Sequence, residues 1–136
     1  MTDVDLMVSL QANRAIFVDY VIVQTLMAAV IVYVAYMFRN FSQLIRASAM
    51  IGAIISILSV TFFVTGVQMV FFASASLMSE MAANGSDLAN NFINTIGQTA
   101  GDPVVQPTFL TLFAVAQTLI NLGLTVYLYM FAKWDS

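Results

Sequence analysis

The stretch Tyr20 to Phe38, YVIVQTLMAAVIVYVAYMF, contains no charged side chain. As a helix it would be about 28 Å long, which matches the roughly 30 Å hydrocarbon layer of a bilayer. Two further runs qualify, within Ala47 to Ser79 and from Thr108 to Ala132. Over the 136 residues only 8% are charged and 61% are hydrophobic, whereas soluble domains carry roughly 25% charged residues. The sequence therefore predicts an all-α integral membrane protein with three transmembrane helices.

The charges predict how these helices are oriented. Arg39, Arg46 and Lys133 flank the ends that the positive-inside rule assigns to the cytoplasm, while Arg14 is the remaining basic residue. The segment from Ser79 to Gln106 contains three acids and no Lys or Arg. We therefore expect a multi-pass protein with three crossings, its N-terminus outside and its C-terminus cytoplasmic.

A single membrane domain, 1–136, is expected on this basis. Its segments are an outer N-terminal part (1–14), a first crossing (15–38), an inner loop (39–46), a second crossing (47–78), an outer loop (79–107), a third crossing (108–132) and an inner tail (133–136). Aromatic residues agree with the orientation, because such residues gather at membrane boundaries. An inner belt is expected from Tyr33, Tyr36, Tyr127, Tyr129 and Trp134.

The second apolar run would be about 50 Å long as a helix, which exceeds the hydrocarbon layer, so we expect it to protrude outward and to stop near Asn84-Gly85. Beyond it, SDLANNFINTIG places Leu88, Phe92 and Ile96 four residues apart, with Ser86 or Asp87 as a cap and Gly97 as a terminator. This pattern predicts a short amphipathic helix, 87–96, in the outer loop. It would cover the protein's own transmembrane helices; the alternative is a docking element for a partner.

Small and polar residues within the crossings predict helix-packing faces, because lipid offers them no hydrogen-bond partner. On the third helix they recur every three or four residues, and on the second they lie four apart. The expected packing residues are Ser48, Gly52, Ser56, Gln68, Thr111, Ala114, Gln117, Thr118, Asn121 and Thr125. A second interpretation is a polar path for ions, protons or a small solute, to which Asp19 and Gln24 would belong.

Several kinds of chemistry lack their usual residues. Without His or Cys, the chain lacks the common ligands of haem, zinc, copper(II) and iron–sulfur centres. The acids form no pair at a helical spacing inside a crossing, and no basic patch suits nucleic acid. We therefore expect no enzyme and no metal site. No cofactor is evident either, although a bound lipid, quinone or pigment would leave no signature in such a sequence.

The leading functional hypothesis is a small accessory subunit of a larger membrane-protein complex, with other membrane subunits and lipid as its partners. The alternative is a homo-oligomeric pore. Three crossings with the N-terminus outside resemble the general layout of three-span phage holins, a resemblance of topology alone. The short tail KWDS departs from the basic hydrophilic tail usual in holins. A hydrophobic helical filament subunit ranks last, because the sequence has no prepilin-type charged start.

Overall fold

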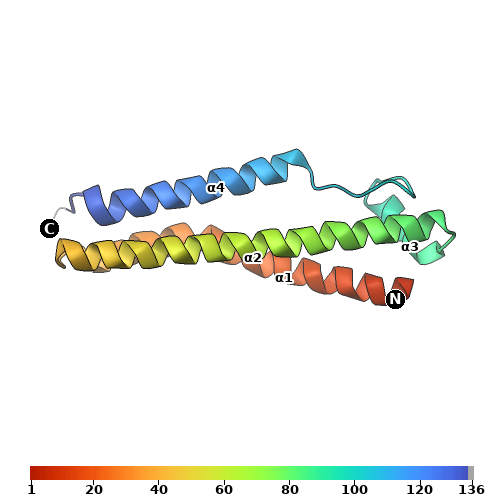
Figure 1. Ribbon diagram of the computed structural model, residues 1–136, viewed down its shortest axis with the longest axis horizontal. Helices are drawn as coiled ribbons and strands as arrows, with labels where there is room; N and C mark the ends of the chain where they lie inside the picture. Colours follow the sequence, from red (N-terminus) through yellow and green to blue (C-terminus); the bar gives the residue numbers. More distant parts are fainter. Residues whose placement is uncertain (135–136) are drawn as a thin grey trace. The chain divides into compact units, whose positions relative to one another are not determined.

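The computed structural model describes residues 1–134; the last two residues of the predicted inner tail lie outside the described residues. The regular structure there is helical: α1 (Asp3–Met37), α2 (Gln43–Ala83), α3 (Asp87–Thr95), α4 (Thr108–Val126) and the short π-helix η1 (Tyr127–Phe131), shown in Figure 1. The stretches Asp3–Met37, Gln43–Ala83 and Thr108–Phe131 are each long and apolar enough to cross a membrane. The prediction of an all-helical chain with three such helices is confirmed.

Helix α1 begins at Asp3. Most of the segment 1–14, which was predicted to precede the first crossing, is therefore already helical. A reciprocal cap explains the early start. The Thr2 hydroxyl accepts a hydrogen bond from the Asp5 amide at 3.1 Å, and the Asp5 carboxylate accepts one from the Thr2 amide at 3.0 Å. Asp5 lies in the first turn, ahead of the apolar stretch that starts at Tyr20. The hydrogen bond from the Thr2 backbone, with a second from its hydroxyl, lowers the pKa of the Asp5 carboxyl below its ordinary value.

Helix α2 ends at Ala83, directly before Asn84-Gly85, so the predicted stop is confirmed. Gly85 adopts φ +93°, the left-handed conformation that glycine tolerates best. The Ser86 amide then donates to the Met81 carbonyl, and the Gly85 amide donates to the Ala82 carbonyl, both at 3.1 Å. These two bonds form a Schellman motif, which satisfies carbonyls that the helix end would otherwise leave unpaired.

The chain packs into two compact units. Unit 1 consists of Met1–Asp19 and Val64–Pro107, and unit 2 consists of Tyr20–Phe63 and the chain from Thr108 onward. Each has its own hydrophobic core.

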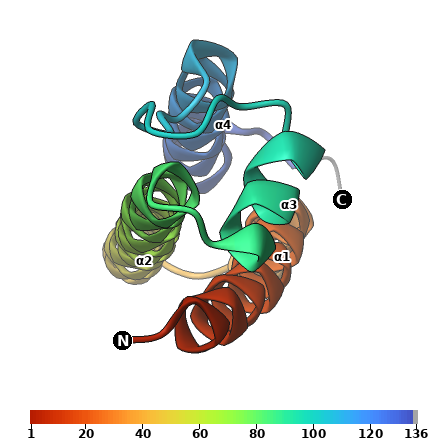
Figure 2. The ribbon, with the colours of Figure 1, turned by 90° about the vertical axis from the view of Figure 1, so that its right-hand side faces the viewer.

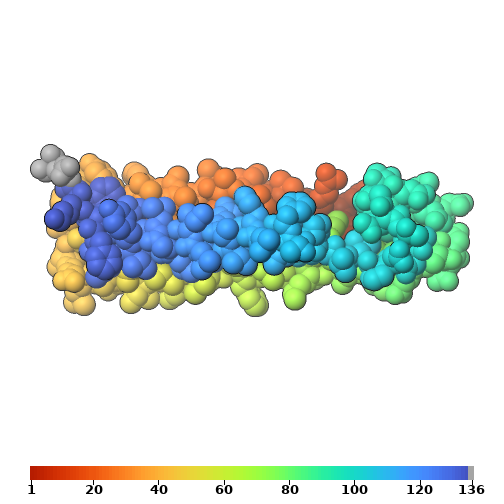
Figure 3. All heavy atoms as spheres, turned by 90° about the horizontal axis from the view of Figure 1, so that it is seen from above, coloured from red at the N-terminus to blue at the C-terminus, as the bar shows by residue number. Residues whose placement is uncertain are grey.

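The core of unit 1 joins the start of α1, the end of α2, α3 and the segment after α3. Its buried members include Leu6, Met78 and Ile93. Figures 2 and 3 show α3 and the chain that follows it packed against the end of α2. Within α3 the fully buried residues are Ala89 and Ile93, one position away from the expected stripe. Small Ala89 allows close approach, whereas Ile96 at the helix end is 40% exposed.

The ends of α3 are capped locally. Ser86 is the N-cap, and its hydroxyl accepts a hydrogen bond from the Ala89 amide at 3.2 Å. At the other end Gly97 adopts φ +70°, and the Gln98 amide donates to the Ile93 carbonyl at 3.0 Å. A second Schellman motif therefore closes this helix.

The core of unit 2 contains Ile31 and Ala35 of α1, Ile57 of α2 and Tyr129 of η1. Tyr129 was predicted to belong to an inner aromatic belt; only 2% of its surface is exposed, so its ring packs into the core. It follows Asn121 and Thr125 at intervals of four residues, and all three are buried, so it continues their face inward.

Candidate functional site

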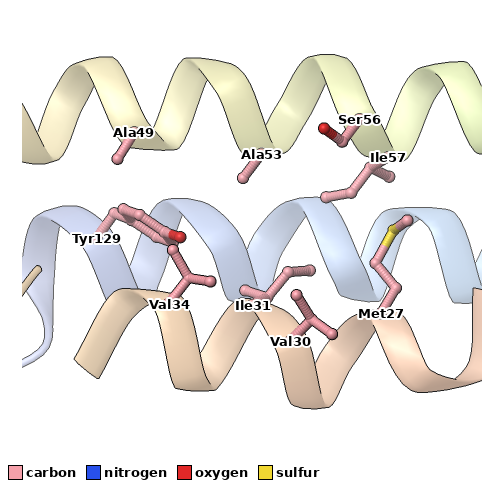
Figure 4. Close-up of a pocket in the computed structure, with 9 residues that line it drawn as sticks. All are labelled: Met27, Val30, Ile31, Val34, Ala49, Ala53, Ser56, Ile57 and Tyr129. Carbon is pink, nitrogen blue, oxygen red and sulfur yellow. The ribbon is translucent and has the colours of Figure 1, made fainter. Parts of the chain in front are cut away.

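A pocket of about 260 Å³ lies within unit 2. Figure 4 shows it between α1 and α2, with Tyr129 closing one part. Helix α1 contributes aliphatic and thioether side chains such as Met27, Ile31 and Val34. The wall is mainly apolar, with Ser56 and Tyr129 as its hydroxyl-bearing residues.

The space exists because α2 carries small side chains where it faces α1. Ala49, Ala53 and Ser56 are spaced by four and three residues, so they share one side of the helix. A larger side chain at Ala53 would enter the space that Figure 4 shows beneath it. Small residues on α2 were predicted only to form a packing face, and this pocket was not predicted from the sequence.

The Tyr129 hydroxyl is the distinctive polar group of the pocket. The ring is almost fully buried, and Figure 4 shows its oxygen directed into the space between the helices. Within residues 1–134 this hydroxyl makes no hydrogen bond. The π-helical turn that carries Tyr129 is closed by the Ala132 amide donating to the Tyr127 carbonyl at 2.9 Å, and such turns often occur at functional sites.

Two donors lie unpaired elsewhere in unit 2. Arg46 Nη2 and Trp134 Nε1 are buried atoms without a hydrogen-bond partner in the described chain. Arg46 is three residues before Ala49, on the same side of α2 as the pocket wall. Trp134 packs against the core cluster that includes Tyr129, with its ring edge-on to Tyr36 at 5.7 Å between centroids. Neither donor was predicted as a site residue.

The predicted packing residues of α4 turn progressively inward. Thr111 is exposed, Ala114, Gln117 and Thr118 are half-buried, and Asn121 and Thr125 are buried. The Thr118 and Thr61 hydroxyls lie 3.2 Å apart, which joins α4 to α2. The C-terminal part of this face, with Asn121 and Thr125, therefore packs inside unit 2.

The predicted packing residues of α2 behave differently. Ser48, Gly52 and Ser56 are exposed. The hydroxyls of Ser48 and Ser56 donate to the carbonyls of Leu44 and Gly52 in their own helix, at 3.0 and 2.9 Å. Apart from its chain neighbours and the backbone of its own helix turn, no atom of the described chain would lie within 4 Å of a Cβ added at Gly52. Gly52 therefore has no neighbour from another helix of unit 2, whereas Ser56 also lines the pocket that faces α1.

The two residues of the proposed polar path differ in burial. Gln24 is buried in unit 2 with 6% exposure, whereas Asp19 is exposed and belongs to unit 1. Gln68, also in unit 1, accepts a long hydrogen bond of 3.5 Å from Gln106.

Two serines of α2 in unit 1 were missed by the sequence analysis. The buried Ser79 hydroxyl accepts a hydrogen bond from the Gly101 amide at 3.0 Å and donates to the Thr99 carbonyl at 3.2 Å. The Ser76 hydroxyl accepts from the Val104 amide at 2.9 Å. Ser76 and Ser79 therefore hold the chain that follows α3.

No His, Cys, Asp or Glu cluster of three or more that could hold a metal ion occurs within residues 1–134. In comparisons with protein families, with curated proteins and with solved structures, no match to this chain was found.

Proposed function

We propose that this chain is a non-catalytic subunit of a larger membrane-protein complex, and that it packs against a neighbouring transmembrane helix through α2. The observation that carries the proposal is the open face around Gly52, flanked by Ser48 and Ser56. Small residues four apart let two helices approach closely and gain dispersion contacts. Since both serine hydroxyls already bond to their own helix, the face can be covered without leaving them unpaired.

The proposal includes an orientation. Arg39 follows α1, Arg46 lies in the first turn of α2 and Lys133 follows η1. An excess of basic residues at these helix ends favours the cytoplasmic side. The acidic segment 79–107 then lies outside, where α3 serves as an amphipathic helix that covers the protein's own helices in unit 1.

The decisive experiment is native gel electrophoresis of the tagged chain from its host membranes in mild detergent, with mass spectrometry of the co-migrating bands. We expect other subunits in a fixed ratio. A monomer that retains no partner would contradict the proposal. Oligomers of this chain alone would favour the holin-like pore instead.

The variant Gly52→Leu tests the face itself. A leucine would force the two helix backbones apart, so we expect association to weaken about tenfold or more, which is about 1.4 kcal/mol. Gly123→Leu is the matched control, because Gly123 is also a helical glycine with open space around it, but on α4. Equal effects of the two substitutions would show that the α2 face is not the interface.

A further inference from the structure

The pocket of unit 2 has the form and chemistry of a site for a hydrocarbon chain. Its volume of about 260 Å³ exceeds the roughly 150 Å³ of an apolar cavity that accommodates benzene. Along α2 it extends from Ala49 to Ser56, about 10 Å at the rise of a helix. A space that follows the helix between aliphatic walls suits a chain better than a compact polar molecule.

The Tyr129 hydroxyl is suited to donate a hydrogen bond to an acceptor atom of a bound molecule. The Tyr129 ring is buried, and its hydroxyl is directed into the pocket, where it makes no hydrogen bond within residues 1–134. A phenolic hydroxyl donates one hydrogen bond, and a carbonyl oxygen in an apolar setting accepts one well. The ester carbonyl at the head of a lipid acyl chain meets both requirements, since it joins an acceptor to a hydrocarbon chain.

The unpaired Arg46 and Trp134 donors indicate which chemical group of the ligand follows the ester carbonyl. Arg46, Ala49, Ala53 and Ser56 follow one another at intervals of three, four and three, so Arg46 lies on the same side of α2 as the pocket wall and one turn before it. Neither Arg46 nor Trp134 lines the pocket itself. Arg46 Nη2 and Trp134 Nε1 are both buried donors without a partner in residues 1–134. An arginine nitrogen and an indole nitrogen can together serve oxygens of one anionic group, and guanidinium binds phosphate particularly well.

The order of these groups along the helices matches the order within a phospholipid. Tyr129 precedes Lys133 by four residues, and basic and aromatic residues mark the membrane boundary. On α2, Arg46 lies one turn closer to that helix end than the pocket residues Ala49 to Ser56. We propose that unit 2 binds one glycerophospholipid, with an acyl chain in the pocket, its ester carbonyl at Tyr129 and its phosphate at Arg46 and Trp134.

Native mass spectrometry of the full chain tests this site. The probes are phosphatidylglycerol and phosphatidylcholine with identical acyl chains, added to delipidated protein in detergent. We expect one lipid per chain to be retained, and phosphatidylglycerol to be preferred because its net negative charge is not offset by a cationic headgroup. No retained lipid, or many lipids bound with equal affinity, would overturn the proposal.

Three substitutions separate the parts of the site. Tyr129→Phe keeps the ring and removes the hydroxyl, so retention of both lipids should weaken about fivefold. Arg46→Gln should reduce the preference for phosphatidylglycerol and change phosphatidylcholine binding less. Ala53→Phe should abolish retention, because the ring fills the pocket. The matched controls are Tyr127→Phe, Arg14→Gln and Ala116→Phe, which change the same residue types at exposed positions outside the pocket.

Solvent extraction of the protein purified from its own membrane identifies the native occupant. A phospholipid supports the proposal, whereas a stoichiometric quinone or pigment would overturn it. Tyr129→Phe changes one oxygen atom only, so it remains informative if Ala53→Phe does not fold. The lipid measurements need no partner subunit, and therefore their failure is distinguishable from failure of the proposed complex.

Discussion

Hydroxyl and amide side chains behave differently in unit 2. Hydroxyls of Thr25, Ser48, Ser56, Thr118 and Thr125 all donate to carbonyls four residues earlier in their own helices. The side chains of Gln24 and Asn121 are buried and make no hydrogen bond within residues 1–134, whereas the Asn13 amide in unit 1 donates to the Ser9 carbonyl four residues earlier at 3.0 Å. In unit 2 the hydroxyls are therefore paired within their own helices, and these two amides are not.

Asn121→Leu tests that difference. Leucine has a similar shape and no polar atoms, so we expect the unfolding free energy of the chain in detergent to rise by about 1 kcal/mol. Thr125→Val is the comparison: its hydroxyl bonds to the Asn121 carbonyl at 2.7 Å, and its loss should destabilise by about 0.6 kcal/mol. A lower unfolding free energy for Asn121→Leu would instead mean that the Asn121 amide forms a stabilising hydrogen bond in the isolated chain.

The sequence allowed only part of the site to be predicted. Spacings of three and four placed Thr118, Asn121 and Thr125 on one helix face, and unit 2 brings the last two into its interior. Tyr129 was assigned to the membrane boundary because it lies among other aromatic residues near Lys133. Its spacing of four from Asn121 and Thr125 is consistent with the inward position that the structure shows, but spacing alone does not reveal the small α2 residues beside it.

At the scale of elements, α2 serves two different purposes. In unit 2 it provides the small-residue wall of the pocket, and in unit 1 its serines hold the connection from α3 to α4. That connection has few apolar residues of its own, with Val104 as a buried one. Its order therefore depends on hydrogen bonds to Ser76 and Ser79. No local sequence pattern indicates which distant hydroxyls bind this connection.

Ser79→Ala tests this attachment. The substitution removes the hydrogen bond to the Thr99 carbonyl inside a packed region, so we expect a loss of about 1–2 kcal/mol in unfolding free energy. Hydrogen exchange of residues 99–104 should accelerate at the same time. Ser48→Ala is the control on the same helix, because the Ser48 hydroxyl bonds only to its own helix. Unchanged exchange in Ser79→Ala would mean that the connection is held by its backbone alone.

For the whole molecule, apolar composition was enough to predict three long helices, since run length and charge decide whether a helix can cross a membrane. The two units were not predicted. They depend on which parts of α1 and α2 share a core, such as Leu6 with Met78 or Ile31 with Ile57. Hydropathy is high throughout both helices, and it does not distinguish these partners.

Orientation can be measured cleanly because the sequence contains no cysteine. Exposed Gln98, after α3, and exposed Asn40, between α1 and α2, are suitable sites for single cysteines. In intact cells a membrane-impermeant maleimide should label Gln98→Cys, and should label Asn40→Cys only after permeabilisation. The reverse pattern would place the acidic segment inside and contradict the proposed orientation.

The charges in the first part of α1 have a consequence for biosynthesis. Between Asp3 and Asp19 the helix carries three aspartates and one arginine, a net charge of −2. In the proposed orientation this segment must be exported, and a potential that is negative inside drives negative charge outward. At about 2.3 kcal/mol per charge for each 100 mV, two charges gain about 4.6 kcal/mol. An energised membrane would thus help to export the start of the chain, and collapse of the potential by a protonophore would slow its insertion.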